Sequence, residues 1–350
     1  FLFIAAAAVL LSVLSFVFIH PILHILQVPK SIYDLMYEYV WVIFWGIGFV
    51  FLYNFFAFLL RAMGNSFTPL CFLGIAAVMN IGLDLLFVVS FGMGAAGAAF
   101  ATVLSQAASG LGIGLYVWGK EPELRPEKRE FALDKRTMSE VIRHSFAASI
   151  QQSVMNFGIL MIQGLVNSFG TIVMAAFAAA VKIDTFAYMP AQEFGNAFSL
   201  FISQNHGAGK AERIRQGVRR AALVSAAFCI VISFFIFLSA PVLMGFFVEK
   251  GESAIIETGS AYLRIEGAFY CGIGLLFLLY GFYRGVEKPE MSLVLTVISL
   301  GTRVLLAYLL SPLPGIGVVG IWWAIPIGWF LADLAGILCL RRVGGYDVRK

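Results

Sequence analysis

Apolar residues fall in long runs along the chain, and charged residues, prolines or glycines separate the runs. Most runs reach the roughly 20 residues that a helix needs to cross a hydrocarbon core about 30 Å thick. We therefore expect each run to form a membrane-spanning helix. The ten runs are 1–19, 34–60, 68–90, 94–118, 145–168, 171–203, 219–247, 255–283, 291–311 and 316–340.

Composition narrows the class further. Of the 350 residues, 60% are hydrophobic and only 13% are charged, whereas soluble domains carry about 25% charged residues. This excludes a water-soluble globular fold, and the high hydrophobicity excludes disorder. The four cysteines have no CxxC spacing and the four histidines form no HExxH motif, so neither a disulfide framework nor a zinc site is indicated. The sequence predicts an all-α, multi-pass integral membrane protein that is not an enzyme and binds no nucleic acid.

The basic residues predict the orientation of the helices. If the loop at Arg61 faces the cytoplasm and the loops alternate from there, 19 lysines and arginines lie on the cytoplasmic side. Only Lys30 and Lys250 lie on the opposite side. Such an excess is typical of cytoplasmic loops. We therefore expect a cell-membrane protein with a cytoplasmic C-terminus.

The chain contains an internal repeat. A shift of 223 residues superposes Arg61 on Arg284 and the glycines of segment 92–97 on those of segment 315–320. The second copy holds six runs and the first shows four, so we expect two further helices before Phe1. The whole would then hold twelve helices in two parallel six-helix halves.

This repeat suggests three domains. We expect the remainder of an N-terminal lobe at 1–118, a cytoplasmic linker at 119–143 and a C-terminal lobe at 144–350.

Three polar residues in the first lobe form a candidate ion site. A charge inside a membrane helix costs at least about 2.5–3.5 kcal/mol at the helix centre, so we expect a charged residue there to have a specific role. Asn80 and Asp84 are four residues apart and share a helix face. Thr102, on the next antiparallel run, lies at a similar depth. These oxygen ligands suit H⁺ or Na⁺, with Na⁺ at Asp84 as the only metal expected. In the alternative interpretation, Asp84 only bonds a neighbouring helix.

Polar residues also follow one face of each of the runs 145–168 and 171–203, and Glu266 and Arg303 lie inside later runs as a candidate ion pair. Amides and hydroxyls between membrane helices can serve only to join the helices. We favour a water-filled substrate cavity. Its expected residues are Gln152, Asn156, Gln163, Lys182, Asp184, Tyr188, Gln192, Glu266 and Arg303.

Several segments resemble the multidrug and toxic compound extrusion (MATE) family of secondary transporters, and in particular its prokaryotic branch. They are LLRAMGNSFTPL (59–70), NIGLDLLF (80–87), GAAGAAFATVLS (94–105), the Gln-Gln pair at 151–152 and MPAQEFGNAFSLFISQNHGAGK (189–210). The resemblance implies a fold of two six-helix lobes around a central cavity. It also implies export of drugs or metabolites driven by H⁺ or Na⁺, without any other cofactor.

The resemblance extends to one of the cation sites of the family. In the N-lobe site, the family uses the Asn and Asp of an NxxxD element and a Thr on the following helix, which Asn80, Asp84 and Thr102 match. It also uses an Asp on the first helix. Some members have a C-lobe site with a Glu and an Asp, where this chain holds Met155 and Ile273. The resemblance therefore does not extend to that second site.

Three functions follow as hypotheses. The leading one is a monomeric antiporter in membrane lipid that exports small organic compounds, cationic or amphipathic, by alternating access. The second is a flippase for lipids or lipid-linked oligosaccharides, whose anionic cargo needs several cations, and Lys182, Arg264 and Arg303 are those available. The third is an intramembrane enzyme, for which the sequence shows no acidic cluster, catalytic histidine or metal motif.

Overall fold

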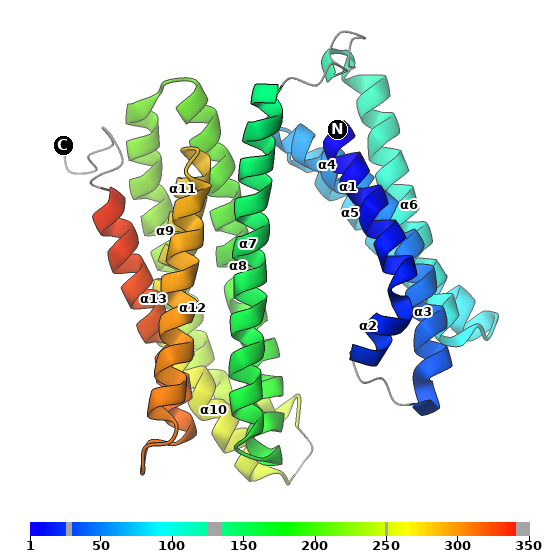
Figure 1. Ribbon diagram of the computed structural model, residues 1–350. Coiled ribbons are helices and arrows are strands. Elements are labelled where there is room, and N and C mark those ends of the chain that lie inside the picture. Colours follow the sequence, from blue (N-terminus) through cyan, green and yellow to red (C-terminus); the bar gives the residue numbers. More distant parts are fainter. Residues whose placement is uncertain (26–29, 125–134, 249–250, 341–350) are drawn as a thin grey trace. The chain divides into compact units, whose positions relative to one another are not determined.

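The computed structural model describes residues 1–25, 30–124, 135–248 and 251–340, and every regular element in these ranges is helical (Figure 1). The prediction of an all-α chain is confirmed. The elements of the first part are α1 (Leu2–Val17), α2 (Ile19–Ile25), the 3₁₀ turn η1 (Lys30–Ile32), α3 (Tyr33–Trp45), α4 (Ile47–Ala62), α5 (Phe67–Asp84), the π-helix η2 (Leu85–Ser90), α6 (Gly94–Lys120) and the 3₁₀ turn η3 (Pro122–Leu124). They are followed by α7 (Lys135–Asn167), α8 (Thr171–Gly207), α9 (Ala211–Gly245), α10 (Ser253–Gly267), α11 (Tyr270–Gly285), α12 (Pro289–Leu310) and α13 (Val318–Leu340).

Most of these helices are able to cross a membrane. Among the described residues, seven spans are long and apolar enough, or eight if α10 and α11 count as one bent span. The 16-residue helix α1 is apolar but shorter. The 33-residue helix α7 is long enough but less apolar, because glutamines and asparagines interrupt it.

Three of the apolar runs contain a break that hydropathy did not predict. The run 34–60 divides into α3 and α4 at Gly46, and the run 68–90 changes from α-helix to π-helix after Asp84. The run 255–283 divides into α10 and α11, which bend by 53°. Conversely, α7 begins at Lys135, inside the stretch 119–143 that we expect to link the lobes. A charged first turn lowers hydropathy without preventing helix formation.

The chain divides into two compact units, Phe1–Leu133 and Asp134–Lys350. In the first unit, α6 packs against α4 and α5. A Cβ on Gly110 would lie 3.3 Å from the carbonyl carbon of Phe49, and one on Gly114 would lie 3.0 Å from the ring of Phe56. Glycines of α6 thus allow α4 to approach closely, which is a common means of joining membrane helices.

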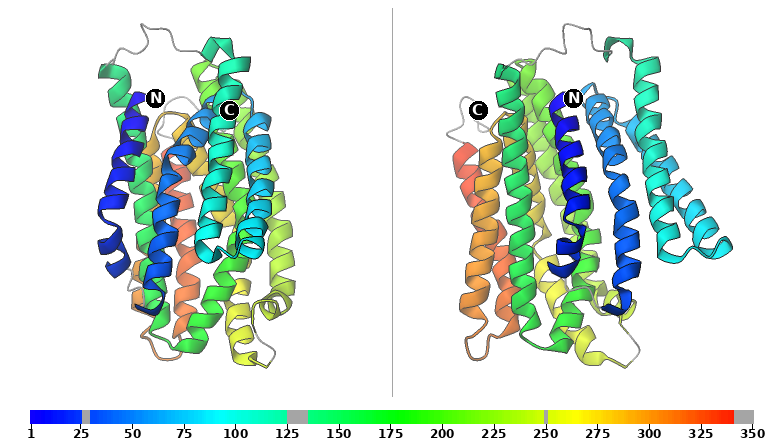
Figure 2. Two further views of the ribbon diagram at one scale, coloured as in Figure 1. Left: turned by 90° about the vertical axis from the view of Figure 1, so that its right-hand side faces the viewer. Right: turned by 45° about the vertical axis from the view of Figure 1, so that its right-hand side comes forward.

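In the second unit, α8 and α9 run side by side as a hairpin (Figure 2), and α8 also packs against α10 and α11. Three of the buried aromatic rings in its core pack directly against one another. Phe177 of α8 stacks on Trp322 of α13 with ring centroids 5.4 Å apart, and Tyr262 of α10 meets Trp322 edge-on at 4.9 Å. These rings fix α8, α10 and α13 relative to one another.

The sequence repeat reappears as a repeated turn. After α4, the amide of Asn65 donates to the carbonyl of Leu60 at 2.9 Å, and after α11 the amide of Lys288 donates to the carbonyl of Tyr283 at 2.9 Å. Both are the six-to-one bond of a Schellman helix end, which needs a left-handed residue before its donor. That residue is Gly64 in the first copy, with φ +90°, and Glu287 in the second, with φ +61°.

Replacing Glu287 with glycine is expected to stabilise the second unit by up to about 1 kcal/mol, because a left-handed conformation costs roughly 1–2 kcal/mol in a residue with a Cβ. The measurement is the thermal unfolding midpoint of the detergent-solubilised full-length protein, which should rise. The matched control is Gly64→Glu, which should lower the midpoint. A lower midpoint in Glu287→Gly would show that the Glu287 side chain contributes more than its backbone strain costs.

Candidate functional site

The first unit brings together two of its three predicted ion ligands. Asn80 lies on α5 and Thr102 on α6, and Nδ2 of Asn80 donates to Oγ1 of Thr102 at 3.5 Å. The Thr102 hydroxyl donates to the carbonyl of Ala98 at 3.0 Å, one turn earlier on its own helix. Both side chains are half-buried. The side-chain amide of Asn80 and the hydroxyl of Thr102 are therefore neighbours across two helices, in contact through the amide nitrogen.

Asp84 is the last residue of α5, one turn beyond Asn80 on the same face. No hydrogen bond joins Asp84 to Asn80 or Thr102, and its Oδ1 atom is buried without a partner. The π-helix η2 begins at the next residue, and π-helical insertions occur frequently at functional sites. A buried carboxylate oxygen without a donor is costly, and a bound proton or cation would relieve that cost.

The second unit holds a buried pair of acidic residues from two helices. Asp184 of α8 is 5% exposed and Glu266 of α10 is 1% exposed. The hydroxyl of Tyr270 donates to Oδ1 of Asp184 at 2.6 Å. Glu266 lies close enough to interact with both Asp184 and Tyr262. Two carboxyl groups and two phenols therefore meet in the core of this unit.

Arg303 of α12 completes this cluster. Its guanidinium interacts electrostatically with Asp184 and with Glu266. Yet Nε of Arg303 and Oε2 of Glu266 are both buried without a hydrogen-bond partner. The predicted pair is thus close in space but not joined by a direct bond. Two carboxyl groups face one guanidinium, so a single bound proton or Na⁺ would make the cluster neutral. We call Asp184, Tyr262, Glu266, Tyr270 and Arg303 the acidic cluster.

A bend in the chain lies beside the acidic cluster. Glu266 is one residue before the end of α10, and its carbonyl accepts from the amide of Phe269 at 2.9 Å as the chain turns into α11. Interrupted helices of this kind carry ion and substrate sites in many transporters. Sequence reasoning missed the bend, Tyr262 and Tyr270. Gly267, directly after Glu266, was the available signal for the bend.

The remaining predicted cavity residues lie elsewhere. Gln152 and Asn156 are exposed on α7 and bond each other at 3.2 Å, and Gln163 donates to Asn167 at 2.8 Å. We call Gln152, Asn156, Gln163 and Asn167 the amide stripe. Of the pair at 151–152, Gln151 contacts another helix, by donating to Thr296 at 3.0 Å.

The predicted cavity therefore separates into two groups within the second unit. Asp184 is buried next to α10, while the amide stripe lies on α7. Tyr188 is half-buried and interacts electrostatically with Asp184, whereas Lys182 is exposed and Gln192 is half-buried. The rotation of α8 explains this division, because its small residues face α11 and so turn Asp184 into the core.

The two positions that are acidic in the C-lobe site of some family members are apolar in this chain. Met155 is half-buried on α7 and Ile273 is buried on α11, beyond the bend. This unit instead carries buried acidic groups at Asp184 and Glu266, which meet in the acidic cluster, and at Asp333 of α13. No group of three or more metal-ligating side chains occurs in the described part of the chain.

Comparisons with known proteins agree with the fold and the motifs. The MatE family model matches residues 1–86 and 146–309. The "Probable multidrug resistance protein YpnP" of Bacillus subtilis (strain 168) is 30% identical over 282 residues, which are 79% of this chain and 62% of that protein. The "Probable multidrug resistance protein NorM" of Thermotoga maritima is 28% identical over 291 residues, covering 81% and 62%. The chain thus spans about three fifths of these curated relatives.

Solved structures confirm the architecture. A structure described as the outward-facing conformation of a multidrug resistance MATE family transporter of the MOP superfamily superposes with a TM-score of 0.91 at 21% identity, covering 100% of this chain and 78% of that one. The relatives are transporters, which confirms the prediction that this chain is not an enzyme. The chain belongs to the MatE family of multi-pass membrane proteins.

Proposed function

We propose that the full-length protein exports small organic compounds, cationic or amphipathic, in exchange for H⁺ or Na⁺. The observation that carries this proposal is a set of carboxylate oxygens that are buried without a hydrogen-bond partner, Oδ1 of Asp84, Oε2 of Glu266 and Oδ1 of Asp333, inside helices of a MatE family chain. Such groups are expensive in a membrane unless they bind an ion. The protein acts as a monomer in the cell membrane, with a cytoplasmic C-terminus and no cofactor other than the ion.

In the first unit, the ion binds at Asp84, and Asn80 and Thr102 supply neighbouring oxygens. Binding neutralises the carboxylate, so it changes which helix positions Asp84 favours. An ion drives export only if it prefers one conformation while the substrate prefers the other. The bonded pair Asn80–Thr102 supports this location because it places the two neutral ligands side by side.

The acidic cluster is a second location for the coupling ion. Asp184 and Glu266 share one arginine, so the gain or loss of a single positive charge switches the cluster between neutral and negative. The amide stripe, Lys182 and Gln192 then provide polar contacts for the substrate, and Tyr188 adds a phenol close to Asp184. The exposed amides of Gln152 and Asn156 support this role because they bond only each other among the described residues.

The flippase hypothesis has less support. Arg303 lies against two carboxyl groups. Arg264 packs on the ring of Phe237, with its guanidinium carbon 5.9 Å from the ring centroid. Of the three available cations, only the exposed Lys182 has neither arrangement. An anionic headgroup would therefore find few free positive charges.

The function is tested in everted membrane vesicles that contain the full-length protein. A fluorescent organic cation is added, and a pH gradient or a Na⁺ gradient is imposed separately. One of the two gradients is expected to drive uptake above that of vesicles without the protein, and an ionophore that collapses that gradient should abolish the difference. Equal uptake with and without both gradients would contradict ion-coupled export.

A further inference from the structure

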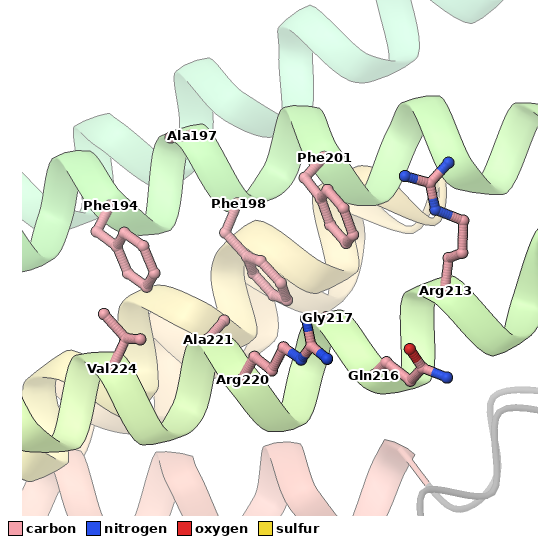
Figure 3. Close-up of a pocket in the computed structure, with 10 residues that line it drawn as sticks. All are labelled: Phe194, Ala197, Phe198, Phe201, Arg213, Gln216, Gly217, Arg220, Ala221 and Val224. Carbon is pink, nitrogen blue, oxygen red and sulfur yellow. The ribbon is translucent and has the colours of Figure 1, made fainter.

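A groove runs along the surface of the second unit between α8 and α9, and Figure 3 shows its lining. Its volume is about 430 Å³. Three rings of α8, from Phe194, Phe198 and Phe201, point toward α9. None of the residues that line the groove belongs to the acidic cluster or to the amide stripe. The groove is therefore separate from the candidate transport site.

The groove changes character along its length. Arg213 lies toward the end where α8 turns into α9, Arg220 lies near the middle, and Val224 lies at the other end opposite Phe194 (Figure 3). The spacing of seven and four residues keeps the three α9 side chains on one helix face. One end is therefore cationic and the other is apolar.

Both arginines are available to a ligand. Arg213 and Arg220 are exposed, and neither makes a hydrogen bond or ion pair with any residue that the structure describes. The nearest acid in sequence, Glu212, is already engaged by Arg215 at 3.8 Å and by Gln216 at 2.9 Å. Within the part of the chain that the structure describes, the positive charge in the groove is thus not cancelled.

The shape of the groove depends on one glycine. A Cβ on Gly217 would lie 2.8 Å from Cζ of Phe201. The absence of that Cβ lets the Phe201 ring pack against the backbone of α9. The rings thus provide a continuous apolar surface beside the arginines.

The length of the groove matches one half of a bilayer. Eleven residues separate Arg213 from Val224, which at 1.5 Å per residue is about 16 Å, and half of a 30 Å hydrocarbon core is about 15 Å. The cationic end belongs to the loop that the distribution of basic residues places in the cytoplasm. The cytoplasmic leaflet is rich in anionic lipids, and basic pockets between membrane helices bind their headgroups.

We propose that this groove binds an anionic phospholipid. Arg213 and Arg220 hold its phosphate by charge-assisted hydrogen bonds, and an acyl chain lies along the rings of Phe194, Phe198 and Phe201. The charge of the arginines selects the headgroup, while the rings and Val224 bind the chain. This site is independent of the proposed transport function.

The test compares phosphatidylglycerol with phosphatidylcholine as probes, measured as lipid adducts of the detergent-purified full-length protein by native mass spectrometry. The double variant Arg213→Gln/Arg220→Gln is expected to lose roughly thirtyfold of the preference for phosphatidylglycerol, since each basic residue near anionic lipid contributes about a factor of five. The control Lys120→Gln/Arg136→Gln removes the same charge from the same expected side, and it should keep the preference.

Two further measurements test the contributions of the acyl chain and of the phosphate separately. Ala197 lines the groove and is exposed, so Ala197→Trp fills the groove without changing charge and should reduce binding of both lipids. Inorganic phosphate at the lipid concentration should not displace phosphatidylglycerol, because it lacks the chain. The proposal is overturned if the double variant keeps its preference, if the control loses as much, or if free phosphate competes equally. If the double variant binds less of both lipids and also elutes at a changed volume, the conservative variant Arg213→Lys/Arg220→Lys is measured in its place. It should retain the preference for phosphatidylglycerol, and loss of the preference there would also overturn the proposal.

Discussion

Replacing Asp84 with asparagine is expected to lower ion-driven export to the level of vesicles without the protein. Asparagine has nearly the same shape as aspartate, so membrane insertion and packing should persist. It cannot gain or lose a charge, however, and the conformational preference that depends on the ion is lost. We expect a fall of at least about fivefold in the initial rate of cation uptake, since the coupling between two sites is typically 1–3 kcal/mol.

The control for this variant is Asp34→Asn, which removes an exposed carboxylate from the first turn of α3 in the same unit. It should export at the wild-type rate when equal amounts of protein are compared. Export by Asp84→Asn at the wild-type rate would exclude Asp84 as the coupling group. If Glu266→Gln alone abolished export, the coupling would instead lie in the acidic cluster.

The second large effect is expected at the contact between α8 and α11. Gly195 and Gly281 face each other with their backbones in contact, and a Cβ on Gly281 would collide with the carbonyl oxygen of Gly195 and lie 3.3 Å from the amide of Ser199. These are backbone atoms of packed helices, so neither can turn aside. Gly281→Val should destabilise the protein by about 3 kcal/mol, because overpacking forces the helices apart.

The measurement is the unfolding midpoint of the detergent-solubilised full-length protein. Gly301→Val is the matched control, because Gly301 also lies inside a helix but has nothing within 4 Å of its ideal Cβ position. It should change stability by less than about 1 kcal/mol. Equal midpoints for the two variants would show that α8 and α11 can separate at little cost.

The positions of the helices could be predicted because hydropathy is a local property. Each apolar run is a continuous stretch of sequence, and the structure places helix in every one of them. The breaks were missed because they depend on contacts. At Gly46, for example, a Cβ would collide with the side chain of Gln106, which lies on a helix far away in the sequence but close in space. No window of neighbouring residues contains that information.

The site was predicted in part for the same reason. The sequence gives the depth of a polar residue along its helix, which identified Asp84, Asp184 and Glu266 as unusual. It does not give the rotation of one helix against another, which decides whether Asp184 faces α7 or α10. Tyr262 and Tyr270 were missed because a tyrosine in a membrane helix is unremarkable until a carboxyl group is found beside it.

The two copies of the repeated turn hold the same backbone path with different residues, Gly64 in one and Glu287 in the other. The path is therefore compatible with a residue that carries a Cβ as well as with glycine. The same six-to-one bond also ends α8, where the amide of Lys210 donates to the carbonyl of Asn205 at 2.9 Å and Gly209 has φ +67°. This turn is thus a general way of closing a long helix before the chain reverses, and it accepts either a glycine or a glutamate at its left-handed position.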